Sequence, residues 1–154
     1  MDSDQLTEHF ARHEFEQHGP MPAVCVDTYR SLCEKILEPV RAEFEKPVTI
    51  TSGYRSPQAN EFVHGVRNSQ HQATASYCAA DFVVPGEDMR SVFDWIRLES
   101  GLPFDQVILE HGASSYVIHV SWAKAYQRRE ALEGATNNRT AYAHLEVDPE
   151  KDNA

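Results

Sequence analysis

The sequence predicts a single α+β domain in which helices flank a small mixed or antiparallel sheet. Its hydrophobic patterns follow the order helix, strand, helix, strand, helix, strand, strand, and neither a repeat nor a linker interrupts them. The chain has 154 residues, of which 41% are hydrophobic and 25% charged, and these values are typical of one globular domain with its own core. We expect an N-terminal arm packed on the body over residues 1–24, a main domain over 25–130 and a C-terminal tail over 131–154.

The first helix is expected after the polar N-terminal arm. Within the arm, "HGPMP" interrupts any helical spacing, and Phe10 and Phe15 are the residues expected to pack it onto the body. From Asp27 to Phe44, apolar residues recur every three or four positions, as in an amphipathic helix. Pro39 lies inside this pattern, so we expect the helix to be kinked there.

Two strands and two helices are predicted in the middle of the chain. Residues 48–51, "VTIT", form a β-branched segment typical of a strand. Ser56 and Pro57 suit the N-cap and the first position of a short helix. Residues 79–84, "AADFVV", predict a buried strand, and residues 87–100, "EDMRSVFDWIRLES", predict a helix with one apolar face.

A hairpin is predicted next. Residues 106–110, "QVILE", and residues 116–122, "YVIHVSW", have the composition of strands, and "HGASS" between them suits a glycine-containing loop. Residues 123–134, "AKAYQRREALEG", fit a terminal helix. The residues after them have the composition of a loosely held tail.

Charge and composition argue against several classes of protein. The formal charge of −10 at pH 7 argues against nucleic-acid binding and against adhesion to anionic membranes, because both need a basic surface. No apolar stretch approaches the ~20 residues of a membrane span, and the first residues lack the basic and apolar regions of a signal peptide. The chain has three cysteines and no Cys-x-x-Cys pair, so we expect reduced thiols in a cytosolic compartment.

Three potential metal ligands fall in turns or strands. His71 precedes the strand that contains Asp81, and His119 lies in the middle of the last hairpin strand. A charged aspartate at the head of an apolar run is costly to bury unless an arginine, backbone donors or a metal ion meets it. Two histidines and an aspartate suit a catalytic zinc site with one open position. The alternative for a single strand histidine is a structural, hydrogen-bonded role.

Three blocks of the sequence together resemble a known family. "VTITSGYRSPQAN", "NSQH…AADF" and "FDQVILE…VIHVSW" are similar to segments of the zinc D-alanyl-D-alanine carboxypeptidase family of peptidoglycan peptidases. The resemblance runs from about Asp27 to Arg129. It implies a hedgehog/DD-peptidase-like fold and one Zn²⁺ per chain, bound by His71, Asp81 and His119.

The spacing of two of these ligands departs from the family pattern. Nine residues separate His71 from Asp81, where the family usually has six, and the family's turn glycine is absent from "QATASYC". A longer loop can bulge into solvent without moving either ligand, because closure entropy changes only slowly with loop length. The alternative is that the three-residue insertion reshapes the wall of the substrate cleft.

The resemblance also implies two catalytic residues. The family's Glu-x-x-His pattern is absent, because Tyr116 lies three positions before His119. Glu110 resembles the glutamate of hedgehog-like and phage-type members, which implies that it is the general base. Arg55 resembles the family arginine that binds a substrate carboxylate or the oxyanion. The alternatives are a solvated carboxylate at Glu110 and an ion pair between Arg55 and Asp81.

Four further residues are candidates for substrate contact or for support of the ligands. Ser69 can hydrogen-bond a zinc ligand, and Gln106 can line the floor of the cleft. Tyr54 belongs either to the rim of the cleft or to the core. His111, beside the implied base, can orient a water molecule or supply a fourth ligand, or it can be an exposed loop residue.

The function expected from this resemblance is a zinc-dependent peptidase that hydrolyses peptidoglycan stem peptides, as a D-Ala-D-Ala carboxypeptidase or a murein endopeptidase. Compact members without a signal peptide look like phage or prophage lysis enzymes, so we expect cytoplasmic synthesis and endolysin-like action at the cell wall. One alternative is a non-catalytic, zinc-stabilised binding or phage structural module of the same fold. Another is a metal-free domain with a buried ion pair between Arg55 and Asp81.

Overall fold

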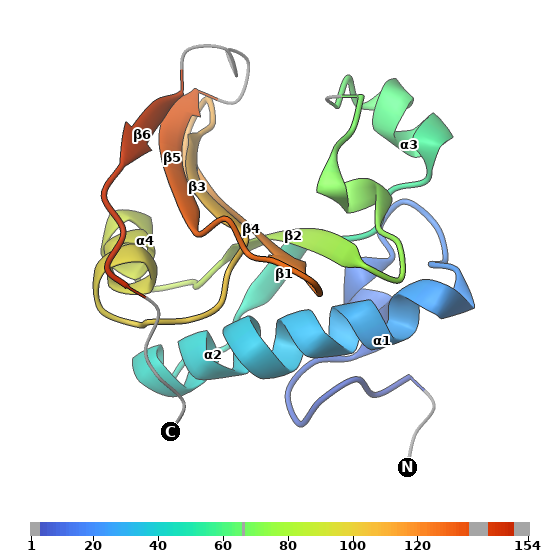
Figure 1. Ribbon diagram of the computed structural model, residues 1–154, viewed down its shortest axis with the longest axis horizontal. Coiled ribbons are helices and arrows are strands. Elements are labelled where there is room, and N and C mark those ends of the chain that lie inside the picture. The colour runs from blue at the N-terminus through green and yellow to red at the C-terminus, as the bar shows by residue number, and fades with distance from the viewer. Residues whose placement is uncertain (1–3, 66, 136–141, 150–154) are drawn as a thin grey trace.

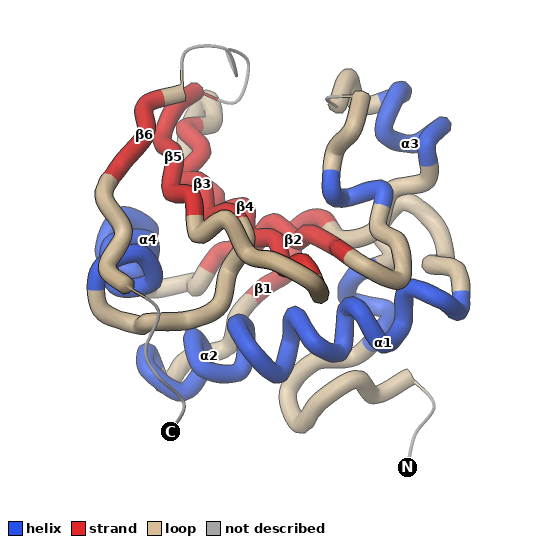
Figure 2. The backbone as a smooth tube through the Cα atoms, in the orientation of Figure 1, coloured by secondary structure: helices blue, strands red, loops and turns tan. Residues whose placement is uncertain are grey.

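A mixed sheet forms the centre of the molecule. The computed structural model describes residues 4–65, 67–135 and 142–149. Its six strands are Thr49–Ser52 (β1), Tyr77–Val83 (β2), Gln106–His111 (β3), Tyr116–Ala123 (β4), Glu130–Ala135 (β5) and Ala143–Leu145 (β6). Their order is β1-β2-β4-β3-β5-β6 (Figure 2). β5 runs parallel to β3, and the other described neighbours are antiparallel. This arrangement confirms the predicted α+β fold.

Helices cover one face of the sheet and stand beside the other. They are Arg12–Phe15 (η1), Ala23–Leu32 (α1), Cys33–Leu37 (η2), Glu38–Phe44 (α2), Pro57–Phe62 (α3), Gln70–Gln72 (η3) and Met89–Leu98 (α4). α1, α2 and α4 lie along one side of the sheet, and α3 stands opposite β5 and β6 (Figure 1). No helix in the described ranges is both long and apolar enough to cross a membrane.

The first helix differs from its prediction at its start and near Pro39. It begins at Ala23, directly after Pro22, and so starts four residues before Asp27. At Pro39 the irregularity takes the form of a π turn, in which the Glu38 N–H bonds to the carbonyl oxygen of Cys33. Proline lacks the N–H that a regular α-helix needs, and the wider turn before it carries the chain past this position.

The segment after β4 is a strand and not the helix predicted over residues 123–134. Residues 130–135 form β5 because they pair in parallel with β3 and bury Ala131 and Leu132. This tertiary pairing overrides the helix propensity of the Ala, Leu and Glu residues in the segment.

Part of the predicted C-terminal tail also joins the sheet. β6 pairs antiparallel with β5, and Val147 packs against the hydrophobic core. The Asp148 backbone N–H donates to the carbonyl oxygen of Arg97, which ties the end of the described chain to α4. Residues 136–141 and 150–154 of the predicted tail lie outside the described residues.

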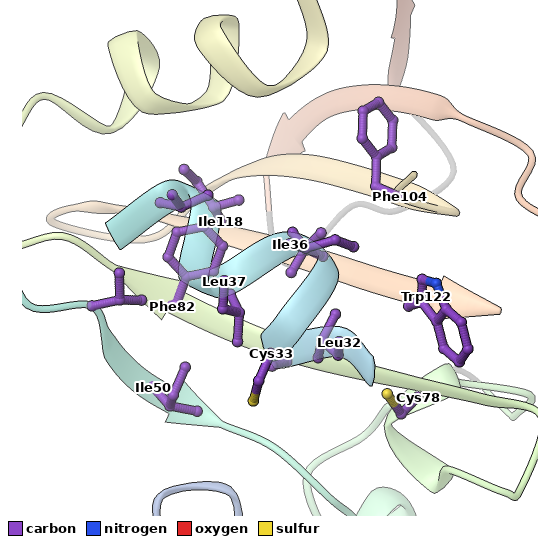
Figure 3. Close-up of a cluster of buried hydrophobic side chains, with 14 of the residues drawn as sticks. Leu32, Cys33, Ile36, Leu37, Ile50, Cys78, Phe82, Phe104, Ile118 and Trp122 are labelled. Carbon is purple, nitrogen blue, oxygen red and sulfur yellow. The ribbon is translucent and has the colours of Figure 1, made fainter. Parts of the chain in front are cut away.

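The main core lies between the long helix and the sheet (Figure 3). Leu32, Ile36 and Leu37 from the helix pack in one cluster with Phe82 of β2 and Ile118 of β4, and all five residues are fully buried. Burial of an aliphatic or aromatic side chain of this size contributes roughly 1.5–3 kcal/mol. The three cysteines are free and buried in the same core. The opposite face of the sheet is not covered by this core, and it lines a cleft.

A buried carboxylate ties the start of β3 to η3. The Asp105 carboxylate accepts hydrogen bonds from the Arg128 backbone N–H at 2.8 Å, the Arg128 guanidinium at 2.9 Å and the Gln70 amide at 2.8 Å. Burial by itself raises the pKa of Asp105, but these donors and the charge of Arg128 outweigh it and hold the pKa below its usual value. The ionised carboxylate is therefore part of the native structure.

We expect Asp105→Asn to lower the free energy of unfolding by about 1–3 kcal/mol at pH 7, because the charge is lost and one of the two acceptor oxygens becomes an NH2 group that faces other donors. The pKa of Asp105 is lower in the folded chain than in the unfolded chain, where it is about 3.9. The stability that the carboxylate contributes is therefore complete at neutral pH and is lost as the pH falls through the folded pKa. Urea unfolding between pH 7 and pH 3 measures this, and the difference between the two proteins should shrink below about pH 4.

Asp27→Asn is the matched control, since the Asp27 side chain is 91% exposed. It should change the stability by less than about 0.5 kcal/mol. Equal stability of Asp105→Asn and the wild type at pH 7 would contradict the role given to this carboxylate.

Candidate metal centre

Three ligand-type side chains from separate elements meet on the open face of the sheet. His71 lies in η3, Asp81 in β2 and His119 in β4, where Asp81 and His119 are directly paired across the two strands. The Asp81 Oδ1 atom lies 3.1 Å from His71 Nε2 and 3.0 Å from His119 Nδ1. All three candidate ligand atoms lie within 4.8 Å of one another. The structure therefore brings together the three residues that the sequence indicated.

The geometry and the donor chemistry suit a divalent metal ion. A tetrahedral ion with ligands at 2.0–2.2 Å requires ligand atoms about 3.3–3.6 Å apart. The two separations from Asp81 Oδ1, 3.1 and 3.0 Å, are close to that range. Two imidazole nitrogens and a carboxylate oxygen are a ligand set that zinc accepts, with a fourth position left for water or substrate. The three residues can therefore hold a metal ion.

Backbone contacts fix which nitrogen of His71 faces the site. His71 Nδ1 lies 2.7 Å from the carbonyl oxygen of Gly53, which can only accept a hydrogen bond. Nδ1 must therefore carry a proton, and Nε2 is the nitrogen that faces Asp81. The Arg55 backbone N–H donates to the His71 carbonyl oxygen at 2.7 Å, and Ser69 caps η3 by accepting from the His71 N–H at 3.2 Å.

Residue 53 must be a glycine because Phe15 packs directly against its backbone and leaves no room for a side chain. A Cβ atom at residue 53 would lie 2.5 Å from the carbonyl oxygen of Phe15 and 2.6 Å from its Cα. The next N–H, that of Tyr54, donates to the same Phe15 oxygen at 2.8 Å. The N-terminal segment thus braces the carbonyl group that orients His71.

Asp81 is the electrostatic centre of the site. Its side chain is 16% exposed, and burial by itself raises the pKa of Asp81. Hydrogen bonds and charge from His71 and His119 outweigh burial and hold the pKa far below its usual value. The Arg55 guanidinium also lies near this carboxylate, with its Nη2 atom 3.8 Å from Asp81 Oδ2. The site is therefore organised around an ionised carboxylate.

Glu110 and Arg55 line the same cleft, which has a volume of about 500 Å³, and each is 8% exposed. Glu110 pairs with Val117 in the β3–β4 hairpin, so it is the diagonal neighbour of His119 on the open face. Arg55 lies on the opposite wall, where its Nη1 donates to the Asn60 side-chain oxygen at 3.4 Å. The cleft thus holds a carboxylate and a guanidinium near the candidate ligands.

The four remaining candidates divide between the cleft and other parts of the molecule. Ser69 and Gln106 line the cleft, and the Gln106 amide donates to Glu130 at 2.6 Å. Tyr54 belongs to the hydrophobic core. His111 lies on the other face of β3, where it contacts Glu133 at 2.7 Å and stacks on a tyrosine ring. The structure does not bring Tyr54 or His111 to the cleft.

The segment between the first two ligands packs on α1. Ala73 is buried, and the Thr28 hydroxyl donates to the carbonyl oxygen of Thr74 at 2.8 Å. Ala75 and Ser76 are exposed, so the segment projects a short turn to solvent. His71 and Asp81 meet at the open face despite the nine residues between them.

Sequence reasoning missed four residues in or near the site. Tyr142 lines the cleft from the predicted tail, Arg128 lines it from the predicted helix, and Gln70 is the middle residue of the Ser-x-His motif. Partial burial and the nearby charge of Arg55 lower the pKa of the exposed His18. Only Gln70 carried a signal in the sequence, through its position in the motif.

Comparison with known proteins agrees with this geometry. The sequence model of the family described as Peptidase M15 matches residues 8–121, well over half of the chain. The match includes the three candidate ligands and both candidate catalytic residues. No curated protein matches the sequence closely enough to be named as a relative. The chain therefore belongs to the Peptidase M15 family, as its resemblance to zinc D-alanyl-D-alanine carboxypeptidases predicted.

Proposed function

We propose that this protein is a zinc-dependent peptidase that hydrolyses stem peptides of peptidoglycan. The observation that carries the proposal is the convergence of His71, Asp81 and His119 in a cleft that also contains Glu110 and Arg55. A metal site alone would fit a structural role. A buried carboxylate and a buried guanidinium in the same cleft add the groups that amide hydrolysis requires.

The proposed roles follow from the chemistry of each side chain. Zinc in this site would supply an activated water molecule and a Lewis acid for the scissile carbonyl. Glu110 accepts the proton of the attacking water and returns it to the leaving amine. Arg55 stabilises the negative charge that develops on the carbonyl oxygen, or binds a carboxylate of the substrate.

Two arginines support a peptide with a free carboxylate as substrate. Arg55 and Arg128 line the cleft together with the carboxylates of Asp81 and Glu110, and Arg128 is also paired with Asp105. Stem peptides carry free carboxylates, which a guanidinium can bind in a bidentate manner. Both a D-Ala-D-Ala carboxypeptidase and a murein endopeptidase fit this chemistry, in a compact enzyme of the phage-lysin type that acts at the cell wall.

One observation favours a second candidate function, a zinc-stabilised binding or phage structural module without catalysis. The position three residues before His119 is Tyr116, which is 39% exposed and stacks on His111. The Glu-x-x-His arrangement is therefore absent. Under this second function the metal would be bound but the cleft would not hydrolyse peptides.

Removing either histidine ligand is expected to abolish zinc binding. The wild type should bind about one Zn²⁺ per chain, and His71→Ala and His119→Ala should weaken binding by more than about 100-fold, since outer-shell changes alone can cost that much. Calorimetric titration and elemental analysis of the dialysed proteins measure this. His144→Ala, at a side chain that is 73% exposed, is the control. A wild type that binds no zinc would favour the metal-free ion pair between Arg55 and Asp81.

Glu110→Gln tests the enzymatic role separately from the metal. The amide keeps the size of the side chain but cannot accept the proton, so kcat should fall by about 10²–10⁴-fold with zinc retained. The assay follows release of D-alanine and of new amino groups from purified sacculi and muropeptides. Glu43→Gln, on an exposed face of α2, is the matched control. If the wild type and Glu110→Gln are equally inert on every muropeptide, the non-catalytic module is the better description.

Arg55→Lys keeps the positive charge and removes the planar fork of donors. We expect kcat/KM to fall by roughly 10²-fold, because an ammonium group cannot reproduce bidentate contacts. Zinc content and melting temperature check that the site and the fold persist. Arg67→Lys, an exposed arginine close to the same cleft wall, should have wild-type activity. Full activity of Arg55→Lys would show that only the charge is needed.

A further inference from the structure

We propose that Tyr142 is a positioning residue for the Glu110 carboxylate and that Gly134 is the position that makes room for its ring. The inference rests on the proposed role of Glu110 as general base. Tyr142 lies outside residues 8–121, so the part of the chain that matches the family does not include it. Its contact with Glu110 joins the C-terminal segment to the cleft.

The contact is a hydrogen bond in the wall of the cleft. The Tyr142 hydroxyl donates to Glu110 Oε2 at 3.0 Å, and both residues line the cleft. Among the described residues no other side chain or backbone group bonds to this carboxylate. One oxygen of Glu110 is thus held by the phenol, and Oε1 is left to receive a proton from water.

Gly134 explains how an aromatic ring reaches this carboxylate. In the parallel pairing of β3 and β5, Gly134 lies in register beside Glu110. A Cβ atom at residue 134 would lie 2.1 Å from Cδ1 and 2.7 Å from Cε1 of the Tyr142 ring. The ring therefore rests directly on the glycine backbone. Leu132, two residues earlier in β5, also lines the cleft, which places this side of Gly134 on the open face.

The sheet also fixes where the ring begins. Tyr142 directly precedes β6, whose first residue, Ala143, pairs with Glu133 of β5. The backbone next to the tyrosine is thus held by strand pairing, and the ring is held by its contact with the glycine. The carboxylate of a glutamate otherwise rotates about its terminal bond, and a hydrogen bond from a fixed phenol restricts that rotation. The result is a base whose reactive oxygen has a defined direction.

Tyr142→Phe is the direct test, because it keeps the ring and removes the donor. We expect kcat to fall by about 10-fold with KM changed less than about 2-fold, as for the loss of a hydrogen bond to a charged group. A fall in kcat with KM nearly constant marks a group that acts on the base and not on substrate binding. A ring that served only to pack against β5 would leave kcat unchanged.

Two more variants separate the contact from general damage to the fold. Gly134→Ala should displace the ring and reproduce the kinetic effect of Tyr142→Phe while keeping the phenol in the chain. Tyr126→Phe, at a tyrosine that is 74% exposed, is the matched control and should behave as the wild type.

A measurement without turnover reports the contact itself. The ¹³C carboxyl resonance of Glu110, assigned by its loss in Glu110→Gln, should move at pH 7 in Tyr142→Phe and stay in place in Tyr126→Phe. An unmoved resonance together with wild-type kcat in Tyr142→Phe would overturn the inference and leave the proposed function standing. Full activity of Glu110→Gln would remove the base itself, and would overturn the role of Glu110 and this inference together.

Discussion

The rest of the structure depends on one ionised carboxylate that is mostly withdrawn from water. Burial opposes the charge on Asp81, and the charge persists because His71 and His119 approach the same oxygen atom from two sides. β2 and β4 must pair in one register for Asp81 and His119 to share a face, since a shift by one residue would turn one of them into the core. The same register places Phe82 and Ile118 in the core, so the packing of the core also fixes the positions of Asp81 and His119.

The cleft is built from two structurally different walls. Short helices and loops that follow β1 supply Arg55 and His71, whereas the sheet supplies Asp81, Glu110 and His119. The two walls are joined by the buried Asp105 network, in which the Gln70 amide of η3 donates to the carboxylate that precedes β3. A rigid sheet wall can hold ligands and a base at fixed separation, and a wall built from loops can vary in shape with the substrate.

The elements with a local signal were predictable from the sequence. Ser56 caps α3 as its position before Pro57 indicated, and the β3–β4 hairpin follows from its two apolar runs and the loop between them. That residues 130–135 and 143–145 form strands of the sheet was not predictable from the sequence. Their pairing is with segments distant in the chain, and the β5 sequence favours a helix by propensity.

The same distinction applies to the site. His71, Asp81 and His119 are recognisable because motif, order and flanking residues all indicate a metal-binding family. Tyr142 and Arg128 have no motif, and they reach the cleft only through the path of the chain around β5 and β6. Tyr54 and His111 show the opposite case, since each is adjacent in sequence to a residue with a proposed catalytic role but faces away from the cleft.

The close packing of Gly53 against Phe15 supports the carbonyl group that orients His71, one of the three candidate ligands, from a segment that contributes no candidate ligand itself. A chain shortened at its N-terminus beyond Phe15 would keep every ligand and the base, yet the carbonyl group that selects the His71 tautomer would lose its support. Residues far from the ligand motif in sequence would in that way govern the affinity of the centre. Substitutions in the first twenty residues could therefore change metal retention without altering any candidate ligand.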